Sequence, residues 1–228
     1  MNRRKIYSLP LACLFCILVF AVSGCKDLQA LSSWKLPTSG QGSAQTGGSY
    51  GQYSNSYDFP AGRSVTFQAF KDRYQTIGTS PEGAVRMYFD ALYSYIDPAR
   101  KAEGAKMVRY SMHEGKNWER SAALATFVSR LKNPSYHYIF RSFAEGTSPE
   151  NSYTMDPDNY RLMFNTSRQE GDYVSLTIWS SGADNPRILG VKQFEDGLWY
   201  VVNNHSTYVE VRPAANQVRT GGHDADLD

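Results

Sequence analysis

The hydrophobic period of this chain changes once, near residue 134. Before that point, apolar residues recur every three or four positions, which is typical of the buried face of an α-helix. After it, short runs rich in aromatic and β-branched residues alternate with polar residues, which is typical of strands. Helices followed by strands predict an α+β domain, in which about three N-terminal helices pack on an antiparallel sheet of four to six strands.

Three helices are expected in the first half of the domain. Ser80 can cap the first of them, because Pro81 and Glu82 suit the first turn of a helix. Gly104 weakens the second, since glycine disfavours a helix interior. Asn117 can cap the third. The expected helices cover 81–96, 98–112 and 118–132.

The second half predicts a series of strands. Val174, Leu176 and Ile178 alternate with other side chains, as on a strand with one buried face. Asp196-Gly197 is the strongest short-range hairpin signal and joins the last two strands. The expected strands cover 135–143, 160–167, 172–180, 187–195 and 198–211, and a possible extra strand covers 64–70.

Residues 1–24 have the layout of a secretory signal peptide. A positive start precedes an apolar run over 6–20, and small residues follow it. The run is short for a membrane-spanning helix, which needs about 20 residues, so a spanning anchor is the weaker interpretation. Cleavage would remove Cys13 and Cys16, so these two cysteines are not expected to form a metal or redox pair.

The stretch 22–25, Val-Ser-Gly-Cys, resembles the lipobox of bacterial lipoproteins. The resemblance implies cleavage before Cys25, a diacylglycerol on its thiol and acylation of the new amine, which would hold the chain on a membrane. The alternative is a plain secreted protein in which this cysteine falls here by chance. In enterobacterial lipoproteins an aspartate after the cysteine commonly retains the protein at the inner membrane, and here that residue is Lys26. The resemblance therefore implies the outer membrane, with the domain in the periplasm.

A tether is expected over 25–58. Its stretch 38–57 contains five Gly, five Ser, three Gln and three Tyr and no charge, so it cannot bury enough apolar surface to offset its ordering entropy. A single folded domain is then expected over 59–213, and a disordered tail over 214–228.

Charge and motifs exclude several functions. The chain has 24 basic and 22 acidic side chains, and loss of the leader would leave 21 and 22, so no basic excess indicates nucleic acid. The sequence contains no GxSxG elbow, Walker loop or HExxH pair. The end of the tail, HDADLD over 223–228, offers metal ligands, but its expected disorder disfavours a rigid site. No metal and no cofactor are therefore expected.

The order of elements resembles the nuclear transport factor 2-like (SnoaL-like) superfamily. PEGAVRMYFDAL over 81–92 resembles its opening helix, and GVKQFEDGLWYVV over 190–202 resembles its late hairpin. The resemblance implies a curved antiparallel sheet wrapped around helices, cone-like, with an internal pocket. In some members such a pocket performs isomerase or dehydratase chemistry with an Asp, or an Asp/His pair, beside a Tyr. The pattern also resembles uncharacterised bacterial domains on lipoproteins, which imply no activity.

Pocket candidates lie on two of the expected strands. Asn203 and His205 share a face of the last strand with Trp199, so they would interrupt an apolar surface as pocket groups do. The alternative is that Asn203-Asn204 forms a bulge or a turn and His205 faces water. His137 is the other candidate, although a partly buried, hydrogen-bonded imidazole is commoner than a catalytic one. Further acid–base candidates are His113, Glu114 and Asp90.

The expected function is that of a lipid-anchored envelope protein that acts by binding. Its ligand would be a protein of an envelope complex or a small apolar molecule. One alternative is an isomerase or hydro-lyase that uses the cone pocket, and another is a structural subunit of an envelope assembly. No catalytic residue is assigned, because no acid–base pair can be placed within hydrogen-bond reach.

Overall fold

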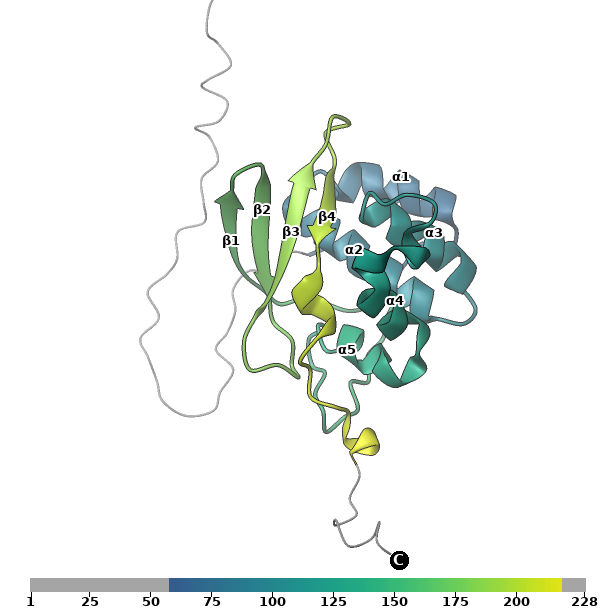
Figure 1. Cartoon of the computed structure of the whole chain (residues 1–228), viewed down its shortest axis with the longest axis vertical. Coiled ribbons are helices and arrows are strands. Elements are labelled where there is room, and N and C mark those ends of the chain that lie inside the picture. Colours follow the sequence, from purple (N-terminus) through teal and green to yellow (C-terminus); the bar gives the residue numbers. More distant parts are fainter. Residues whose placement is uncertain (1–57, 219–228) are drawn as a thin grey trace, which may run out of the picture. The chain divides into compact units, whose positions relative to one another are not determined.

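Residues 58–218, which the computed structural model describes, form an α+β domain. Five α-helices come first, where about three were expected, and a four-stranded antiparallel sheet follows. The α+β class and the order of elements are confirmed, and the number of helices is not. The helices lie on one side of the sheet (Figure 1). Residues 1–57 and 219–228 lie outside the described part, and with them the predicted leader, Cys25, nearly all of the tether and most of the tail.

The helices and strands have clear bounds. The helices are α1 Phe67–Ile77, α2 Pro81–Ile96, α3 Lys101–Ser111, α4 Ala125–Lys132 and α5 His137–Arg141. The strands are β1 Phe164–Glu170, β2 Tyr173–Ile178, β3 Arg187–Gln193 and β4 Trp199–Asn203, paired in that order as a meander.

α2 is the central helix of the domain. Its predicted cap is confirmed, since the hydroxyl of Ser80 accepts a hydrogen bond of 3.1 Å from the amide of Gly83. Thirteen of its 16 residues are buried, which is typical of a helix enclosed on all sides. It contacts β2, β3 and β4 on one side and α3, α4 and α5 on others. Aromatic rings fill the space around it, as where Phe89 lies 5.1 Å from Phe143 between ring centroids.

Gly104 allows α3 to pack closely against α2. A Cβ atom at this position would lie 2.3 Å from the backbone nitrogen of Tyr95 and 2.5 Å from the carbonyl carbon of Ser94. No side chain fits there without moving the α2 backbone. The glycine that weakens the helical pattern of α3 is therefore required by the packing of α3.

The expected strand over 64–70 is wrong, because α1 begins inside it. The hydroxyl of Thr66 accepts a hydrogen bond of 3.2 Å from the amide of Ala69 and caps the helix. α1 then buries Phe70 and Tyr74 in the core. A helical cap therefore outweighs the β propensity of this stretch.

The expected strand over 135–143 is also wrong. The side chain of Asn133 accepts a hydrogen bond of 3.0 Å from the amide of Ser135 and starts a 3₁₀ turn that continues into α5. α5 buries Ile139 and Phe140, so tertiary packing decides its conformation.

The third expected helix is shorter than predicted. Ser121 is extended, with φ −65° and ψ 126°, and it separates two 3₁₀ turns that precede α4. Only the last eight residues of 118–132 are α-helical.

The sheet has the predicted hairpins but ends early. Gly171 and Gly197 take φ values of +62° and +78° in the turns, a conformation that glycine favours. β4 ends at Asn203, so the expected strand over 198–211 is wrong in its second half. The reason is Asn204, whose side-chain amide turns inward and donates a 2.9 Å hydrogen bond to the hydroxyl of Tyr88. A 3₁₀ turn, His205–Tyr208, follows it.

Candidate functional site

The candidates of the last expected strand do not share one face. Asn203 is exposed and His205 stands in the 3₁₀ turn, also exposed, with its Nδ1 2.8 Å from the side-chain oxygen of Asn203. Trp199 is half-buried, and its backbone carbonyl accepts a 2.7 Å hydrogen bond from the hydroxyl of Tyr74. The chain turns between Trp199 and His205, so the two cannot line one wall.

The other candidates lie on different elements. His137 begins α5, and its Nε2 is 2.9 Å from the carbonyl oxygen of Leu131. Burial lowers the pKa of His137, and the hydrogen bond to Leu131 opposes that effect. His113 follows α3 with a φ of +52°, and its ring stacks on Phe194 at 4.0 Å. Glu114 is exposed beside it.

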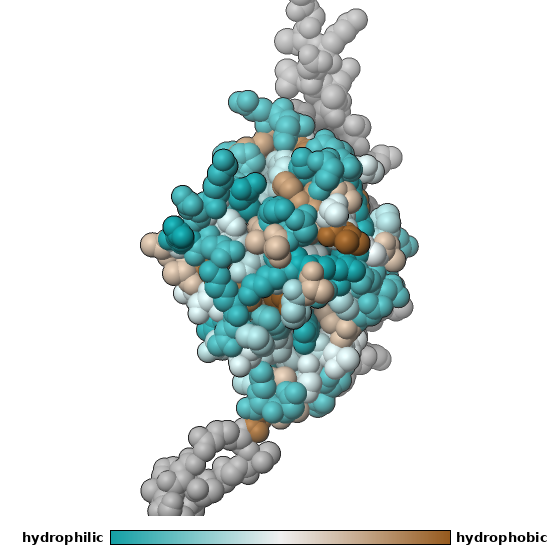
Figure 2. All heavy atoms as spheres, turned by 90° about the vertical axis from the view of Figure 1, so that its right-hand side faces the viewer, coloured by the Kyte–Doolittle hydropathy of each residue, from teal (hydrophilic) through white to brown (hydrophobic). Residues whose placement is uncertain are grey.

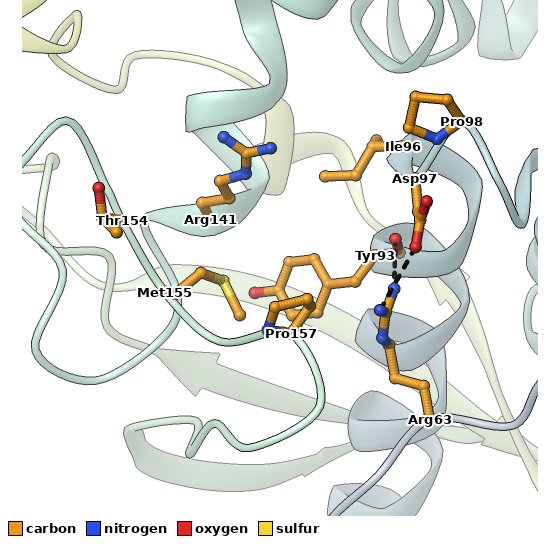
Figure 3. Close-up of a pocket in the computed structure, with 9 residues that line it drawn as sticks. All are labelled: Arg63, Tyr93, Ile96, Asp97, Pro98, Arg141, Thr154, Met155 and Pro157. Atoms are coloured by element: carbon orange, nitrogen blue, oxygen red, sulfur yellow. Dashed lines mark hydrogen bonds and ion pairs between the residues drawn. The ribbon is translucent and has the colours of Figure 1, made fainter.

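A pocket of about 370 Å³ lies elsewhere, beside the C-terminal end of α2. Its walls come from α2, the end of α5 and the loop over 154–157 (Figure 3). This volume is at the lower end of the range for small-molecule sites, about 300–1,000 Å³. The lining residues are Arg63, Tyr93, Ile96, Asp97, Pro98, Arg141, Thr154, Met155 and Pro157.

Tyr93 forms a rigid part of the pocket wall. Its hydroxyl donates a 3.0 Å hydrogen bond to the carbonyl oxygen of Phe140, and its ring meets the ring of Tyr160 edge-on at 4.8 Å. Burial raises the pKa of Tyr93, and the charges of Arg86 and Arg141 oppose the rise, so the phenol is neutral at physiological pH. Because Tyr93 is only 1% exposed, it supports the wall from within and leaves the contact with a ligand to the half-buried side chains of Ile96, Met155 and Pro157.

Arg63 lines the pocket as a buried and fully engaged cation. Its Nη1 donates a 2.7 Å hydrogen bond to the carbonyl oxygen of Tyr93. Its Nε and Nη2 donate to the two carboxylate oxygens of Asp158, at 3.0 and 3.2 Å. Its Nη2 is also 3.5 Å from Asp97. These hydrogen bonds lower the pKa of Asp158 and leave Arg63 with a structural role.

Arg141 differs from Arg63. It is exposed at the end of α5, and its side chain extends from that helix beside the pocket (Figure 3). Within residues 58–218, its guanidinium makes no hydrogen bond and no ion pair. The pocket thus combines mixed apolar and polar walls with one cation that no carboxylate of residues 58–218 neutralises.

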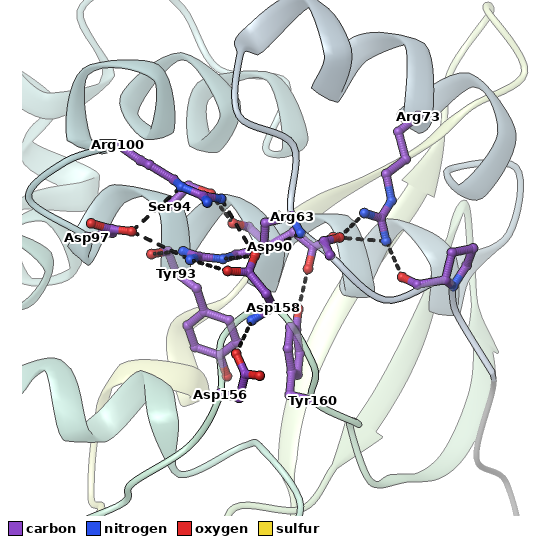
Figure 4. Close-up of polar contacts among 12 residues, drawn as sticks. Arg63, Arg73, Asp90, Tyr93, Ser94, Asp97, Arg100, Asp156, Asp158 and Tyr160 are labelled. Atoms are coloured by element: carbon purple, nitrogen blue, oxygen red, sulfur yellow. Dashed lines mark hydrogen bonds and ion pairs between the residues drawn. The ribbon is translucent and has the colours of Figure 1, made fainter.

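Asp90 lies in a buried polar network near the pocket (Figure 4). Its Oδ1 accepts hydrogen bonds from Nε of Arg86 at 3.0 Å and from the hydroxyl of Tyr160 at 2.7 Å. Nη2 of Arg73 is 3.7 Å from its Oδ2. Burial raises the pKa of Asp90, and the charges of Arg86 and Arg73 oppose the rise. Because Asp90 is only 1% exposed and does not line the pocket, it cannot touch a ligand there.

The network ties distant parts of the chain to α2. Arg73 donates to the carbonyl oxygens of Pro60 and Gly62, and the amide of Gly62 donates a 2.6 Å hydrogen bond to the carbonyl oxygen of Asp158. The segment before α1 and the loop before β1 are thereby fixed against the same end of α2. This fixes one side of the pocket.

Between residues 58 and 218, no group of three His, Cys, Asp or Glu side chains is placed to hold a metal ion. None of the helices in this range combines the length and the apolar character that crossing a membrane requires.

A family model described as "Domain of unknown function (DUF6935)" matches residues 64–215. The match covers well over half of the chain and spans all five helices and all four strands. The chain belongs to this family. Of the pocket-lining residues, only Arg63 lies outside the matched range. No curated protein and no solved structure matches the chain.

Proposed function

We propose that the protein is a lipid-anchored envelope protein whose domain binds a small molecule. The pocket beside Tyr93 carries this proposal. Its walls include the apolar side chains of Ile96, Met155 and Pro157 and, in nearly equal share, the polar groups of Asp97, Arg141 and Thr154. In small-molecule sites apolar surface supplies affinity and polar groups fix orientation, so a ligand with both an apolar and a polar part suits this lining.

The positions of the titratable groups support binding over catalysis. A general acid or base must come within hydrogen-bond reach of its substrate. Asp90 is enclosed by its ion pairs, and His113, His137 and His205 stand on three separate segments that do not line the pocket. No contact among the described residues favours the isomerase, hydro-lyase or structural-subunit alternatives.

On its helix side, the surface of the domain does not favour a protein partner. The face on the helix side of the domain is largely hydrophilic, with only scattered hydrophobic residues (Figure 2). Protein-binding sites are commonly marked by contiguous apolar patches of several hundred Å². This face has no such mark.

The anchor is the second half of the proposal. The lipobox-like stretch that ends at Cys25 would fix the chain to the outer membrane, facing the periplasm. The 33 residues over 26–58 would span roughly 30 Å as a flexible coil. That reach would let the domain take up a ligand from solution at some distance from the lipid headgroups.

The cone-like form of the fold belongs to the same proposal. Helices on one side of an antiparallel meander support it (Figure 1). The likeness to the nuclear transport factor 2-like superfamily stays a prediction. In the superfamily the pocket lies between helices and sheet, whereas here side chains pack in that layer, as where the ring of Tyr74 on α1 stacks on the ring of Tyr200 on β4 with 5.3 Å between centroids. The proposed ligand site is therefore placed at the end of α2.

A fragment screen tests the binding proposal. The full chain, reconstituted in phosphatidylcholine nanodiscs, is screened by ligand-observed NMR against neutral, anionic and cationic fragments. Thr154→Trp places an indole at the exposed rim of the pocket, and Thr76→Trp adds the same group at an exposed position on α1. The proposal expects fragments that bind the wild type and Thr76→Trp but not Thr154→Trp. Binding that Thr154→Trp leaves unchanged, or no binding at all, would overturn it.

A further inference from the structure

The charges around the pocket do not balance. Arg63 and Asp97 lie on one side of it, 3.5 Å apart, and Arg63 also binds Asp158. Arg100 adds a second cation to Asp97 and Asp158, at 3.8 and 3.6 Å. Both carboxylates are therefore compensated within this group. The remaining charged residue of the lining, Arg141, has no carboxylate partner in the described part of the chain.

The position of Arg141 gives its charge a specific role. An exposed arginine surrounded by water is ordinary and needs no partner. Arg141, however, stands beside apolar walls, where a bound ligand would displace water and weaken the screening of its charge. A guanidinium also offers two parallel donors, which match the two oxygens of a carboxylate.

The wall opposite the helices is held in place. Ser152 and Tyr153, which precede the wall residues Thr154 and Met155, both take left-handed φ values, +53° and +54°. Such values cost free energy in residues other than glycine, so surrounding contacts must fix them. Tyr153 supplies these contacts, because it is fully buried and its hydroxyl donates a 2.7 Å hydrogen bond to the carbonyl oxygen of Arg212. The pocket is therefore preformed on this side.

We infer that the ligand is a small amphiphilic anion. Its carboxylate pairs with the guanidinium of Arg141, and its hydrocarbon part lies against the half-buried side chains of Ile96, Met155 and Pro157. This inference rests on the proposed binding function and adds the chemical class of the ligand. A cation is disfavoured because Asp97, the only carboxylate of the lining, is already shared by two arginines.

Three probes of one chain length test the inference. Hexanoate, hexan-1-ol and hexylamine carry a negative, a neutral and a positive head on the same hydrocarbon chain. Each is titrated calorimetrically into the full chain in phosphatidylcholine nanodiscs at pH 7.4, with empty nanodiscs as the blank. Hexanoate is expected to bind about ten-fold more tightly than hexan-1-ol, because a charge-assisted hydrogen bond contributes that much affinity. Hexylamine is expected to bind least.

Arg141→Met is the decisive variant. It keeps an unbranched apolar side chain and removes the charge, so it should abolish the preference for hexanoate and leave hexan-1-ol unchanged. Arg120→Met is the matched control, since Arg120 is an exposed arginine outside the pocket. This control should keep the preference.

The outcomes separate the inference from the proposed function. If hexan-1-ol or hexylamine binds as tightly as hexanoate, and Thr154→Trp removes that binding, the pocket binds ligands but the anion assignment is wrong. A preference for hexanoate that survives Arg141→Met would also overturn the assignment. If none of the three probes binds, both the inference and the binding function are overturned.

Discussion

Asp90 and Arg86 form an ion pair of 3.0 Å, one helical turn apart on α2, in the interior of the domain. The two residues expose only 1% and 2% of their surface. Removing two charges from water costs several kcal/mol for each ion, and that cost is offset only when further hydrogen bonds satisfy both groups. Here the hydroxyl of Tyr160 donates to Asp90, and its carbonyl oxygen accepts from Arg86 at 3.1 Å.

Arg86→Met should destabilise the domain by about 3 kcal/mol at pH 7.5, because it leaves a buried carboxylate without its nearest cation. Burial already raises the pKa of Asp90, and loss of Arg86 should raise it further. A carboxyl with a raised pKa in the folded state binds its proton more tightly than in the unfolded chain. The free energy of unfolding that Arg86→Met removes should therefore be smaller at pH 5 than at pH 8, as measured by urea unfolding.

The double variant Arg86→Met/Asp90→Asn provides the control for this experiment. It removes both charges and keeps an acceptor for the hydroxyl of Tyr160, so it should recover part of the stability that Arg86→Met loses. The free energy of unfolding of this double variant should no longer depend on the protonation of residue 90. Additive effects of the two substitutions would show that the pair is not coupled.

The fold class was predictable because the helical and strand periods occupy separate halves of the chain. The cap at Ser80 and the turn at Gly197 are local signals, and each is found where the sequence places it. The errors fall where tertiary contacts override local propensity. The aromatic stretch over 135–143 has the composition of a strand. It forms α5 instead, because the helix buries Ile139 and Phe140 in the core.

The pocket could not be predicted from sequence. Its cation, Arg141, lies in a stretch whose composition predicts a strand, and its wall residue Met155 lies in a loop without a motif. Arg63 and Asp158 are 95 residues apart, and only the tertiary structure brings them together. Asp90 is a titratable candidate by its residue type, but the sequence around it does not indicate that two arginines and a tyrosine enclose it.

Gly104→Ala should destabilise the domain although alanine is the better helix former. Helix propensity alone predicts a gain of about 1 kcal/mol. The new Cβ would overlap the backbone of α2 at Tyr95, and overpacking of this kind costs about 1–3 kcal/mol. A net loss of about 1 kcal/mol or more is expected in urea unfolding of the full chain, because backbone cannot move aside as a side chain can.

Gly115→Ala is the matched control for that substitution. A Cβ at Gly115 would meet no atom within 4 Å, and this glycine does not take a left-handed φ. The variant should be neutral or slightly more stable than the wild type. Equal effects at the two glycines would contradict the packing role of Gly104.

His137→Gln should remove part of the acid sensitivity of the domain. Burial lowers the pKa of His137 in the folded state below its usual value of about 6.5. The neutral form therefore contributes stability that is fully present above about pH 6.5 and is lost as the pH falls below that value. Glutamine can keep the hydrogen bond to the carbonyl oxygen of Leu131 and does not titrate. The stability difference between wild type and variant should therefore change between pH 7.5 and pH 5, as followed by urea unfolding.

His205→Gln is the control for the pH experiment, because His205 is exposed. It should follow the wild-type pH profile. If it flattens the profile as much as His137→Gln does, burial of His137 is not the cause of the acid sensitivity.

Cys25→Ser should abolish incorporation of labelled palmitate, because serine lacks the thiol that would accept the diacylglycerol. The uncleaved chain should then accumulate, since cleavage before residue 25 depends on that lipid. A variant that still carries label, or a wild-type chain that carries none, would contradict the lipobox interpretation.

Lys26→Asp tests the membrane on which the anchored protein resides. If the chain follows the enterobacterial rule, aspartate after the lipidated cysteine should move the protein from the outer-membrane to the inner-membrane fraction of a density gradient. Lys26→Arg keeps the positive charge and should stay in the outer-membrane fraction. The acyl chains are the same in all three proteins, so lipid affinity cannot cause a difference, and the shift would report receptor recognition of the residue after Cys25. Recovery of the wild type in the inner-membrane fraction would overturn the outer-membrane proposal, and cleavage by protease added to intact cells would place the domain on the cell surface.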